Sequence, residues 1–363
     1  MAAMLVTGGA LVAGSLEANA QAPVFGATFL SGLDADTTTS VALSVNNQGR
    51  VVGFGSTANG LRGFLWSAAS DPVKLEDLAG GGEHSIARAI NDQGVVVGES
   101  IGIDADSATI WFGSSSYQPA RLQSVAGQAA GTSSRATSIN LQNHVVGRTG
   151  NFMNRRAAVW TAGPPNLLQM VGEQTSSMEL TAVSNLGAVV GRIGTASGTT
   201  GAMFASPSGQ GRVLSTFGQP GYAIAMDVNT SSTVVGGIRR PNRIPAMVNQ
   251  LRPVLPIHNV KPMLWIAAQF IGDLTRISGS PVAGEANSVN EGGDIVGIGY
   301  VESGARAYMW SARYGAVDLN DVVGNIAPYT LVSANSISER GVIVGSAVNT
   351  ETRTTHAFIL TPM

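Results

Sequence analysis

One short motif recurs seven times along the chain at nearly constant spacing. Its clearest copy is Ile90-Asn91-Asp92-Gln93-Gly94-Val95-Val96-Val97-Gly98, in which an Asn follows an apolar residue and an apolar run ends in Gly. We call the Asn or Ser position the anchor of each repeat. The anchors are Asn46, Asn91, Asn140, Ser184, Asn229, Asn290 and Ser338. A period of about 45 residues indicates a repeat architecture with one supersecondary unit per copy.

A second landmark keeps the same register. About twenty residues after the anchor, a bulky residue closes an apolar triplet, at Trp66, Trp111, Trp160, Phe204 and Trp310. In the seventh repeat the matching run is 357–360. In the fifth repeat the position falls on Asn249. This repeat is longer than the others, and its extra residues, at about 250–265, are predicted in a loop between its third and fourth strands.

Each repeat is predicted to form four short strands. In the second repeat, Asn91-Asp92-Gln93-Gly94 has Asn first and Gly fourth, as type I turns favour. This turn separates a first strand at 87–91 from a second at 95–97, and a third follows at 108–111. The fourth strand is expected in a segment containing Leu, such as 75–78 or 121–125. Short strands at regular spacing with turns between them indicate an all-β fold.

The strands favour a seven-bladed β-propeller over a sandwich. Val95-Val96-Val97 and Phe64-Leu65-Trp66 are apolar on consecutive residues, whereas a sheet with one wetted face alternates. Stacked blades bury both faces, and four strands in 40–50 residues matches a blade. A β-solenoid is the second interpretation. The seventh repeat stops after its third strand, so residues 27–33 are predicted to supply its fourth strand and close the ring. We expect one domain over residues 21–363.

The repeat resembles that of the HAF-repeat family of bacterial extracellular repeat proteins. The family core, Ala-x-x-Ile-Asn-x-x-Gly-x-Val-Val-Gly, is matched at 87–98, and its His-Ala-Phe element occurs at His356-Ala357-Phe358. Its Asp-Leu element is echoed at Asp77-Leu78, Asp273-Leu274 and Asp318-Leu319. The resemblance covers about residues 29–360. It implies export and a propeller-like fold, and it implies no reaction.

The first twenty residues are predicted to be a secretory signal peptide. An apolar stretch ends in Ala18-Asn19-Ala20, a small-x-small cleavage pattern. No later segment is long and apolar enough for a transmembrane helix. We therefore expect a secreted or periplasmic bacterial protein, monomeric after cleavage. A net charge of −2 and the absence of cysteine argue against a nucleic-acid partner and against thiolate chemistry.

Several polar loops are candidate binding sites. Fourth-to-first-strand and second-to-third-strand connections emerge on the same face of a four-stranded meander. Acidic residues and one histidine occupy such connections, at Asp34, Asp36, Glu83, His84, Asp104 and Asp106. No cofactor is predicted, and calcium is the one ion whose preference for carboxylate oxygens fits these loops.

The fifth repeat adds a basic loop on that face. Arg239, Arg240 and Arg243 lie in its second-to-third-strand connection. The guanidinium fork suits carboxylate or phosphate ligands. These arginines are the predicted contacts for an anionic ligand.

No catalytic residue is predicted. Gly98-Glu99-Ser100-Ile101-Gly102 matches a nucleophile elbow, but that motif requires a following helix and a partner histidine. The preferred interpretation is an exported, non-catalytic binding or structural propeller that engages a surface polymer, glycan or protein. The alternative is a carbohydrate-active hydrolase or lyase that uses loop carboxylates. Its candidate acids are Asp34, Asp36, Asp104, Asp106 and Asp227.

Overall fold

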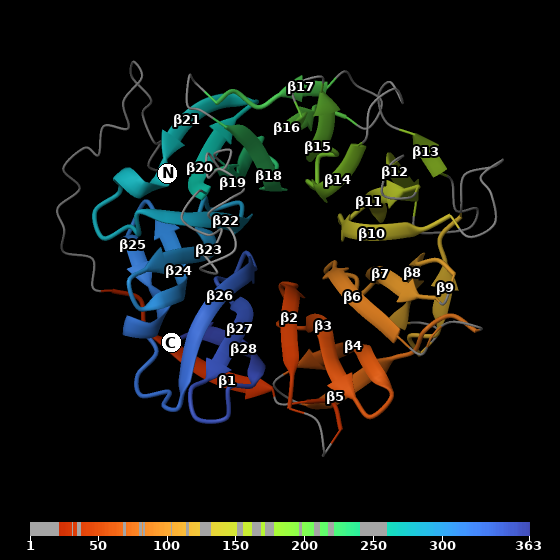
Figure 1. Cartoon of the computed structure of the whole chain (residues 1–363), viewed down its shortest axis with the longest axis horizontal. Coiled ribbons are helices and arrows are strands. Elements are labelled where there is room, and N and C mark those ends of the chain that lie inside the picture. The colour runs from red at the N-terminus through yellow and green to blue at the C-terminus, as the bar shows by residue number, and fades with distance from the viewer. Residues whose placement is uncertain are drawn as a thin grey trace, which may run out of the picture.

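Each copy of the repeat forms one four-stranded antiparallel sheet in the computed structural model, and the seven sheets surround a central axis (Figure 1). The predicted seven-bladed β-propeller is confirmed. The structure describes residues 22–30, 32–34, 38–67, 70–79, 82, 84–102, 104–113, 116–123, 132–150, 155–161, 168–170, 178–195, 198–206, 211–216, 221–239 and 260–363. Within these residues, no helix is long and apolar enough to cross a membrane.

The blades are numbered along the chain, and the strands of each run from the channel outwards. Blade 1 contains β2 (Ser40–Val45), β3 (Val51–Thr57), β4 (Gly60–Ser67) and β5 (Ser70–Leu75). Blade 2 contains β6 (His84–Ile90), β7 (Val96–Ile101), β8 (Ser107–Trp111) and β9 (Pro119–Arg121). Blade 3 contains β10 (Ser134–Ile139), β11 (His144–Thr149), β12 (Arg156–Thr161) and β13 (Leu168–Met170).

The next three blades repeat this order. Blade 4 contains β14 (Met178–Val183), β15 (Val189–Thr195), β16 (Gly198–Phe204) and β17 (Gly211–Val213). Blade 5 contains β18 (Tyr222–Val228), β19 (Thr233–Arg239), β20 (Val260–Ile266) and β21 (Gln269–Asp273). Blade 6 contains β22 (Ala283–Val289), β23 (Ile295–Val301), β24 (Gly304–Ser311) and β25 (Gly315–Asp318). Short 3₁₀ turns η3 (Leu274–Arg276) and η4 (Leu319–Asp321) follow β21 and β25.

The two ends of the described chain meet in blade 7. This blade contains β26 (Tyr329–Ile337), β27 (Ile343–Asn349) and β28 (Thr355–Pro362), and its outer strand is β1 (Phe25–Leu30). β1 runs antiparallel to β28 with Phe25 opposite Pro362 and Leu30 opposite Ala357. Figure 1 shows the red β1 beside the blue β28. Ring closure by the N-terminal strand is therefore confirmed, and it removes two sheet edges that would otherwise be unpaired.

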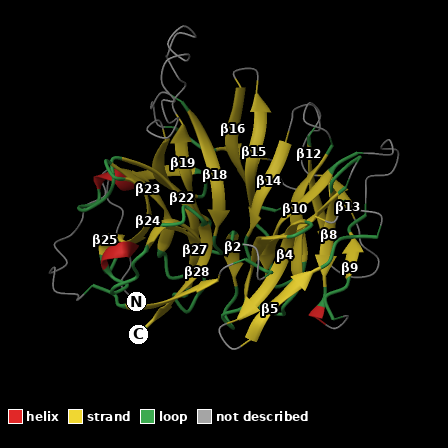
Figure 2. Cartoon of the chain, turned by 60° about the horizontal axis from the view of Figure 1, so that its bottom comes forward, coloured by secondary structure: helices red, strands yellow, loops and turns green. Residues whose placement is uncertain are grey.

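Consecutive apolar residues are buried on opposite faces of a blade, as predicted. In β7, Val96 packs into the cluster shared with blade 1, which contains Leu65 and Leu75. The next residue, Val97, packs into the cluster shared with blade 3, which contains Trp160. The blades stand side by side around the channel (Figure 2), so every inner sheet face has a neighbour to pack on. Burial on both faces is the reason why these strands do not alternate in polarity.

The glycine that ends the repeat core permits a close approach between strands. A Cβ at Gly98 would lie 1.9 Å from the carbonyl oxygen of Ile86 on the neighbouring strand. The pairing of β6 with β7 shifts register between Ala87 and Ala89, which marks a β-bulge at Arg88. A side chain at Gly98 would therefore push the innermost strand out of place.

The anchor asparagines link each blade to the next. The Oδ1 atom of Asn91 accepts from the amides of Gln93 at 3.1 Å and Val95 at 3.0 Å, which closes its own turn. Its Nδ2 donates to the carbonyl of the next anchor, Asn140, at 3.0 Å. Corresponding Nδ2 donations run from Asn46 to Asn91, from Asn140 to Ser184 and from Asn229 to Asn290. The repeated Asn is thus a tertiary contact as well as a turn residue.

The structure corrects the prediction for the fifth repeat. Its third strand is β20, and Trp265 rather than Asn249 takes the bulky position, opposite Val234. Trp265 is fully buried, and its Nε1 donates to the carbonyl of Ser215 at 2.8 Å, as Trp111 does to Glu76. A small polar Asn could not fill this space between blades. The extra residues therefore precede the third strand, in the second-to-third-strand connection, and Asn249 lies outside the described residues.

The fourth strands begin earlier than predicted. β5 ends at Leu75 and β9 ends at Arg121, where the sequence pattern placed their beginnings. The leucines that suggested these strands, Leu75 and Leu122, are buried at the strand ends. They mark core contacts at the edge of a blade and not the middle of a strand.

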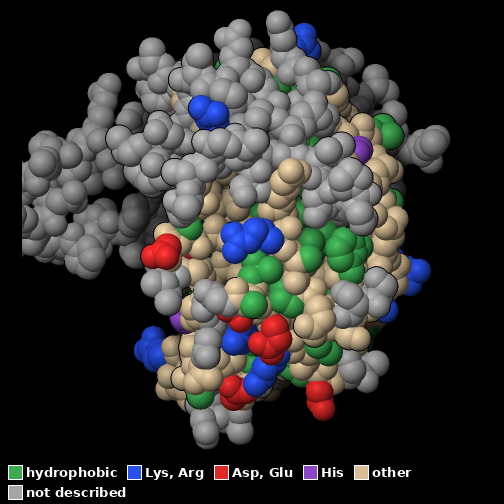
Figure 3. All heavy atoms as spheres, turned by 90° about the vertical axis from the view of Figure 1, so that its right-hand side faces the viewer, with side chains coloured by type: hydrophobic (Ala, Val, Ile, Leu, Met, Phe, Trp, Pro, Cys, Tyr) green, Lys and Arg blue, Asp and Glu red, His purple; other side chains and the backbone are tan. Residues whose placement is uncertain are grey.

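The described surface is largely uncharged. Charged residues are 12% of the chain, and Figure 3 shows acidic and basic side chains interleaved among neutral ones on one side of the ring.

Candidate functional site

The channel has two chemically different ends. We call the end formed by the seven first-to-second-strand turns the turn face. The opposite end, formed by the second-to-third-strand and fourth-to-first-strand connections, is the loop face. Asp34 of a fourth-to-first connection accepts from the amide of Ala58 in a second-to-third connection, at 3.3 Å. The prediction that these two kinds of loop share a face is confirmed there.

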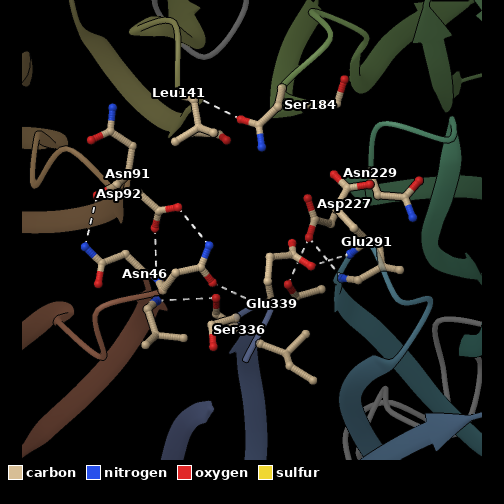
Figure 4. Close-up of a pocket in the computed structure, with 18 of the residues that line it drawn as sticks. Asn46, Asn91, Asp92, Leu141, Ser184, Asp227, Asn229, Glu291, Ser336 and Glu339 are labelled. Carbon is tan, nitrogen blue, oxygen red and sulfur yellow. Dashed lines mark hydrogen bonds between the residues drawn. The ribbon is translucent and has the colours of Figure 1, made fainter. Parts of the chain in front are cut away.

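The turn face encloses a cavity of about 280 Å³ with acidic residues around it (Figure 4). Asp92 accepts from the backbone amide of Asn47 at 2.8 Å, and Glu339 accepts from the amide of Glu291 at 2.8 Å. Asn47 in turn accepts from the amide of Glu339 at 2.9 Å. These bonds connect residues next to the anchors of neighbouring blades. The acidic side chains of the turn face therefore hold the ring together.

Asp227 lines the same cavity and is bound from three sides. It accepts from the hydroxyl of Ser288 at 2.9 Å and from the amides of Val289 at 3.0 Å and Val228 at 2.8 Å. Burial raises the pKa of its carboxyl despite these hydrogen bonds. Burial also raises the pKa of Glu339, with a contribution from the neighbouring acids. The hydrogen bonds offset part of the desolvation, and those from Ser288 and Val289 link blade 5 to blade 6.

The loop face carries ion pairs between blades. Glu99 of β7 has a side chain that is 1% exposed and contacts Arg88 of its own blade and Arg135 of β10 in blade 3. One interface further, Glu179 of β14 contacts Arg148 at 3.4 Å and Arg155 at 3.3 Å, both from blade 3. In each case one carboxylate lies between two guanidinium groups.

Beyond these pairs lies a cavity of about 310 Å³ that we call the arginine pocket. Its lining is Arg155, Glu179, Arg192, Tyr222, Ala223, Ile224 and Arg239. Arg192 and Arg239 are exposed, and neither forms an ion pair with any residue that the structure describes. The pocket spans blades 3, 4 and 5 and presents more positive than negative side chains. Such a cavity is chemically suited to an anion.

Glu285 of blade 6 lies outside the lining of the pocket but interacts electrostatically with two of its arginines. Burial raises the pKa of its carboxyl, while Arg239 and Arg192 act in the opposite direction. Within the described residues, Glu285 forms no ion pair with Arg192 or Arg239.

The candidate residues of blades 1 and 2 form a separate group. Asp34 pairs with Lys74 of the outer strand β5, and this bond holds the pKa of Asp34 below its ordinary value. His84 accepts at Nδ1 from the amide of Leu61 at 3.1 Å. Both residues thus support loops between blades. Asp36 and Glu83 lie outside the described residues.

Asp104 and Asp106 differ in their surroundings. Asp104 is exposed, whereas the backbone of Asp106 bonds to blade 3 through Ser134 at 2.9 Å. Burial raises the pKa of the Asp106 carboxyl, and Glu99 adds to the effect. Across the residues that the structure describes, no group of three or more His, Asp or Glu side chains lies close enough to hold a metal ion. Calcium in these loops stays a prediction.

The acids proposed for a hydrolase or lyase do not share one cleft where they are described. Asp227 lines the turn face, whereas Asp34 pairs with Lys74 at the loop face. Ser100 of the apparent nucleophile elbow is buried in β7. It accepts from the amide of Leu78 and the hydroxyl of Thr109, both at 3.0 Å. These contacts are structural.

Sequence reasoning identified only one member of the arginine pocket, Arg239. Arg240 and Arg243 lie outside the described residues. Arg155, Arg192, Glu179 and Tyr222 were missed because they come from three different repeats, in blades 3, 4 and 5. The signal that could have found two of them is the register itself, since Arg192 follows its anchor by as many residues as Arg148 does, and Glu179 precedes its anchor as Arg135 does.

No protein-family model matches the chain, and no curated protein matches it. Among solved structures, it is similar to a catalytically inactive variant of virginiamycin B lyase from Staphylococcus aureus, solved with quinupristin. The identity is 9% and the TM-score 0.52, covering 93% of this chain and 100% of that one. TolB from Acinetobacter baumannii matches with 9% identity and a TM-score of 0.47, covering 87% of this chain. This chain spans 64% of that TolB chain. At such identity the likeness extends to the fold alone.

Proposed function

We propose that this chain is an exported, non-catalytic binding protein that holds an anionic ligand at the arginine pocket. The observation that carries the proposal is the meeting of Arg155, Arg192 and Arg239 from three blades at one cavity, in a chain of net charge −2. Charges gathered at a concave site attract a ligand of the opposite sign. Its partner is a surface polymer or glycan, and the protein acts as a monomer.

The acids of the loop face support a binding role over an acid–base role. Glu99 and Glu179 are each engaged by two arginines, and Asp34 is engaged by Lys74. A carboxylate whose oxygens already contact cationic side chains is poorly placed to reach a proton of a substrate, as general acid–base catalysis requires. We also assign the chain to the HAF-repeat family, on the repeat core described above. Export is the location that this family implies.

Retention on immobilised anionic polymers tests the binding proposal. The purified chain should bind polygalacturonate or dextran sulfate at low salt and elute as NaCl rises, because salt screens exposed charges. The double variant Arg192→Gln, Arg239→Gln should elute at clearly lower salt. Arg212→Gln is the matched control, since Arg212 is an exposed arginine on the outer strand β17 of blade 4. A wild-type chain that passes through every anionic column unretained would refute the proposal.

Export has its own test. Expressed with its full sequence in a bacterial host, the protein should appear outside the cytoplasm with Gln21 as its first residue. N-terminal peptide mass spectrometry of the cell fractions gives the answer directly. A protein recovered only from the cytoplasm with residues 1–20 intact would contradict export.

A further inference from the structure

The ion pairs of the loop face follow a rule of register. The eighth residue after the anchor of one blade meets the fifth residue before the anchor of the next blade. Glu99 meets Arg135 by this rule, and Arg148 meets Glu179. The rule has a geometric basis, because β7 packs against β10 and β11 packs against β14. Opposite charges at these two positions therefore lie together at two successive interfaces.

At the third interface the rule brings Arg192 to a position without an acid. Arg192 is the eighth residue after Ser184, and the fifth residue before Asn229 is Ile224. β15 packs against β18, and both residues line the arginine pocket. Arg239 lines it as well. Two arginines thus occupy this interface, as they do at the two before it, but no described carboxylate forms an ion pair with either of them.

We propose that the ligand supplies such a carboxylate, and that the ligand is a sugar acid, a uronate unit of an acidic polysaccharide. Its carboxylate bridges Arg192 and Arg239 beside Ile224, in the role that Glu179 plays between Arg148 and Arg155. This inference rests on the proposed function, because it names the chemical class of ligand for the same pocket.

The lining favours a carboxylate over a sulfate or phosphate group. Glu99 and Glu179 show that this fold matches two guanidinium groups with one carboxylate. Glu179 itself stays at the wall of the pocket. A carboxylate of the ligand between Arg192 and Arg239 would repeat the pairing that these two internal carboxylates make.

The same wall favours a sugar over an acidic peptide. Glu179 offers carboxylate oxygens that accept hydrogen bonds, and Tyr222 offers a half-buried aromatic ring with a hydroxyl. A uronate carries hydroxyl donors next to its carboxylate, whereas an aspartate or glutamate side chain carries only methylene groups there. The cavity of about 310 Å³ is at the small end of ligand pockets and suits a single ring.

The deciding variant replaces the apolar wall with an internal carboxylate. Ile224→Glu should occupy the place of the ligand and pair with Arg192, so trigalacturonate should bind at least about tenfold more weakly. Ile224→Gln is the matched control, equal in size but uncharged, and should bind within about threefold of wild type if the charge is decisive. Because Ile224 is buried, both variants are first checked by thermal melting. Arg192→Gln and Arg239→Gln change exposed residues and give the same test without perturbing the core.

Isothermal titration of the full chain compares four probes: trigalacturonate, its carboxyl-reduced neutral form, a sulfated dextran oligosaccharide and a triglutamate peptide. We expect trigalacturonate to bind at least about tenfold more tightly than the other three, with Arg192→Gln and Arg239→Gln each weakening it by about tenfold. Equal binding of the sulfated or peptide probe would overturn the sugar-acid assignment and leave the arginine pocket as a general anion site. Unchanged binding of trigalacturonate by Ile224→Glu would overturn the placement of the ligand between Arg192 and Arg239. If the wild-type chain binds none of the anionic probes, the proposed function itself is rejected.

Discussion

The anchor ring offers the sharpest test of what stabilises this fold. Asn91 is 5% exposed, and its side chain makes four hydrogen bonds. Two of them, to the amide of Val95 and to the carbonyl of Asn140, involve buried partners, each at 3.0 Å. Asn91→Ala removes both. The bonds to Gln93 and Asn143 are only partly buried, so water can replace them.

The expected loss follows from the two buried partners. Each buried group left without a hydrogen bond costs about 1–3 kcal/mol, so Asn91→Ala should lower the free energy of unfolding by about 2–6 kcal/mol. For 363 residues the unfolding entropy is about 0.75 kcal/mol per kelvin, and the melting temperature should fall by about 3–8 °C. Tryptophan fluorescence and circular dichroism during thermal and guanidinium unfolding measure both quantities.

Asn91→Ser is the matched control because serine already serves as the anchor in blades 4 and 7. The hydroxyl of Ser184 accepts from the amide of Ala188 at 3.1 Å. Asn91→Ser should therefore keep the bond to Val95, lose only the donation to Asn140, and show about half the loss of Asn91→Ala. If Asn91→Ala unfolds like the wild type, neither the turn bond nor the link to Asn140 stabilises the ring.

Two further predictions concern blade 7. Deletion of residues 21–34 removes β1 and the stacking of Phe29 on Tyr329, whose ring centroids are 4.1 Å apart. The melting temperature should therefore drop markedly. An unchanged melting curve would count against closure of the ring by this strand. Burial lowers the pKa of His356, against a smaller opposing effect of the Leu30 carbonyl. Below about pH 6.5, His356 binds a proton more readily in the unfolded chain than in the folded chain. The free energy of unfolding should therefore decrease as the pH falls from 7 to 5. His356→Gln should flatten part of that slope in guanidinium titrations at several pH values, and an identical slope would exclude His356 as its source.

The order of the blades was predictable from the sequence because it depends on local chemistry. The Asn-x-x-Gly turn, the apolar run and the terminal glycine each act within one repeat, and seven copies in register leave few alternatives to a ring. The closing role of residues 27–33 was predictable for a similar reason, since a blade that lacks its outer strand must find one. The prediction for the fifth repeat was wrong because it placed the bulky residue of the third strand by its distance from the anchor. Burial between blades instead selects Trp265 over Asn249.

The charges at the channel depended on the tertiary structure. Glu99 and Arg135 are in different repeats, as are Arg192 and Ile224, and nothing local relates the members of either pair. They meet because neighbouring blades pack with a fixed offset between the second strand of one and the first strand of the next. Long arginine side chains then reach across that interface to whatever charge is there. The repeated motif specifies the ring of blades, whereas the packing of neighbouring blades specifies which arginines have a carboxylate partner and which face the pocket.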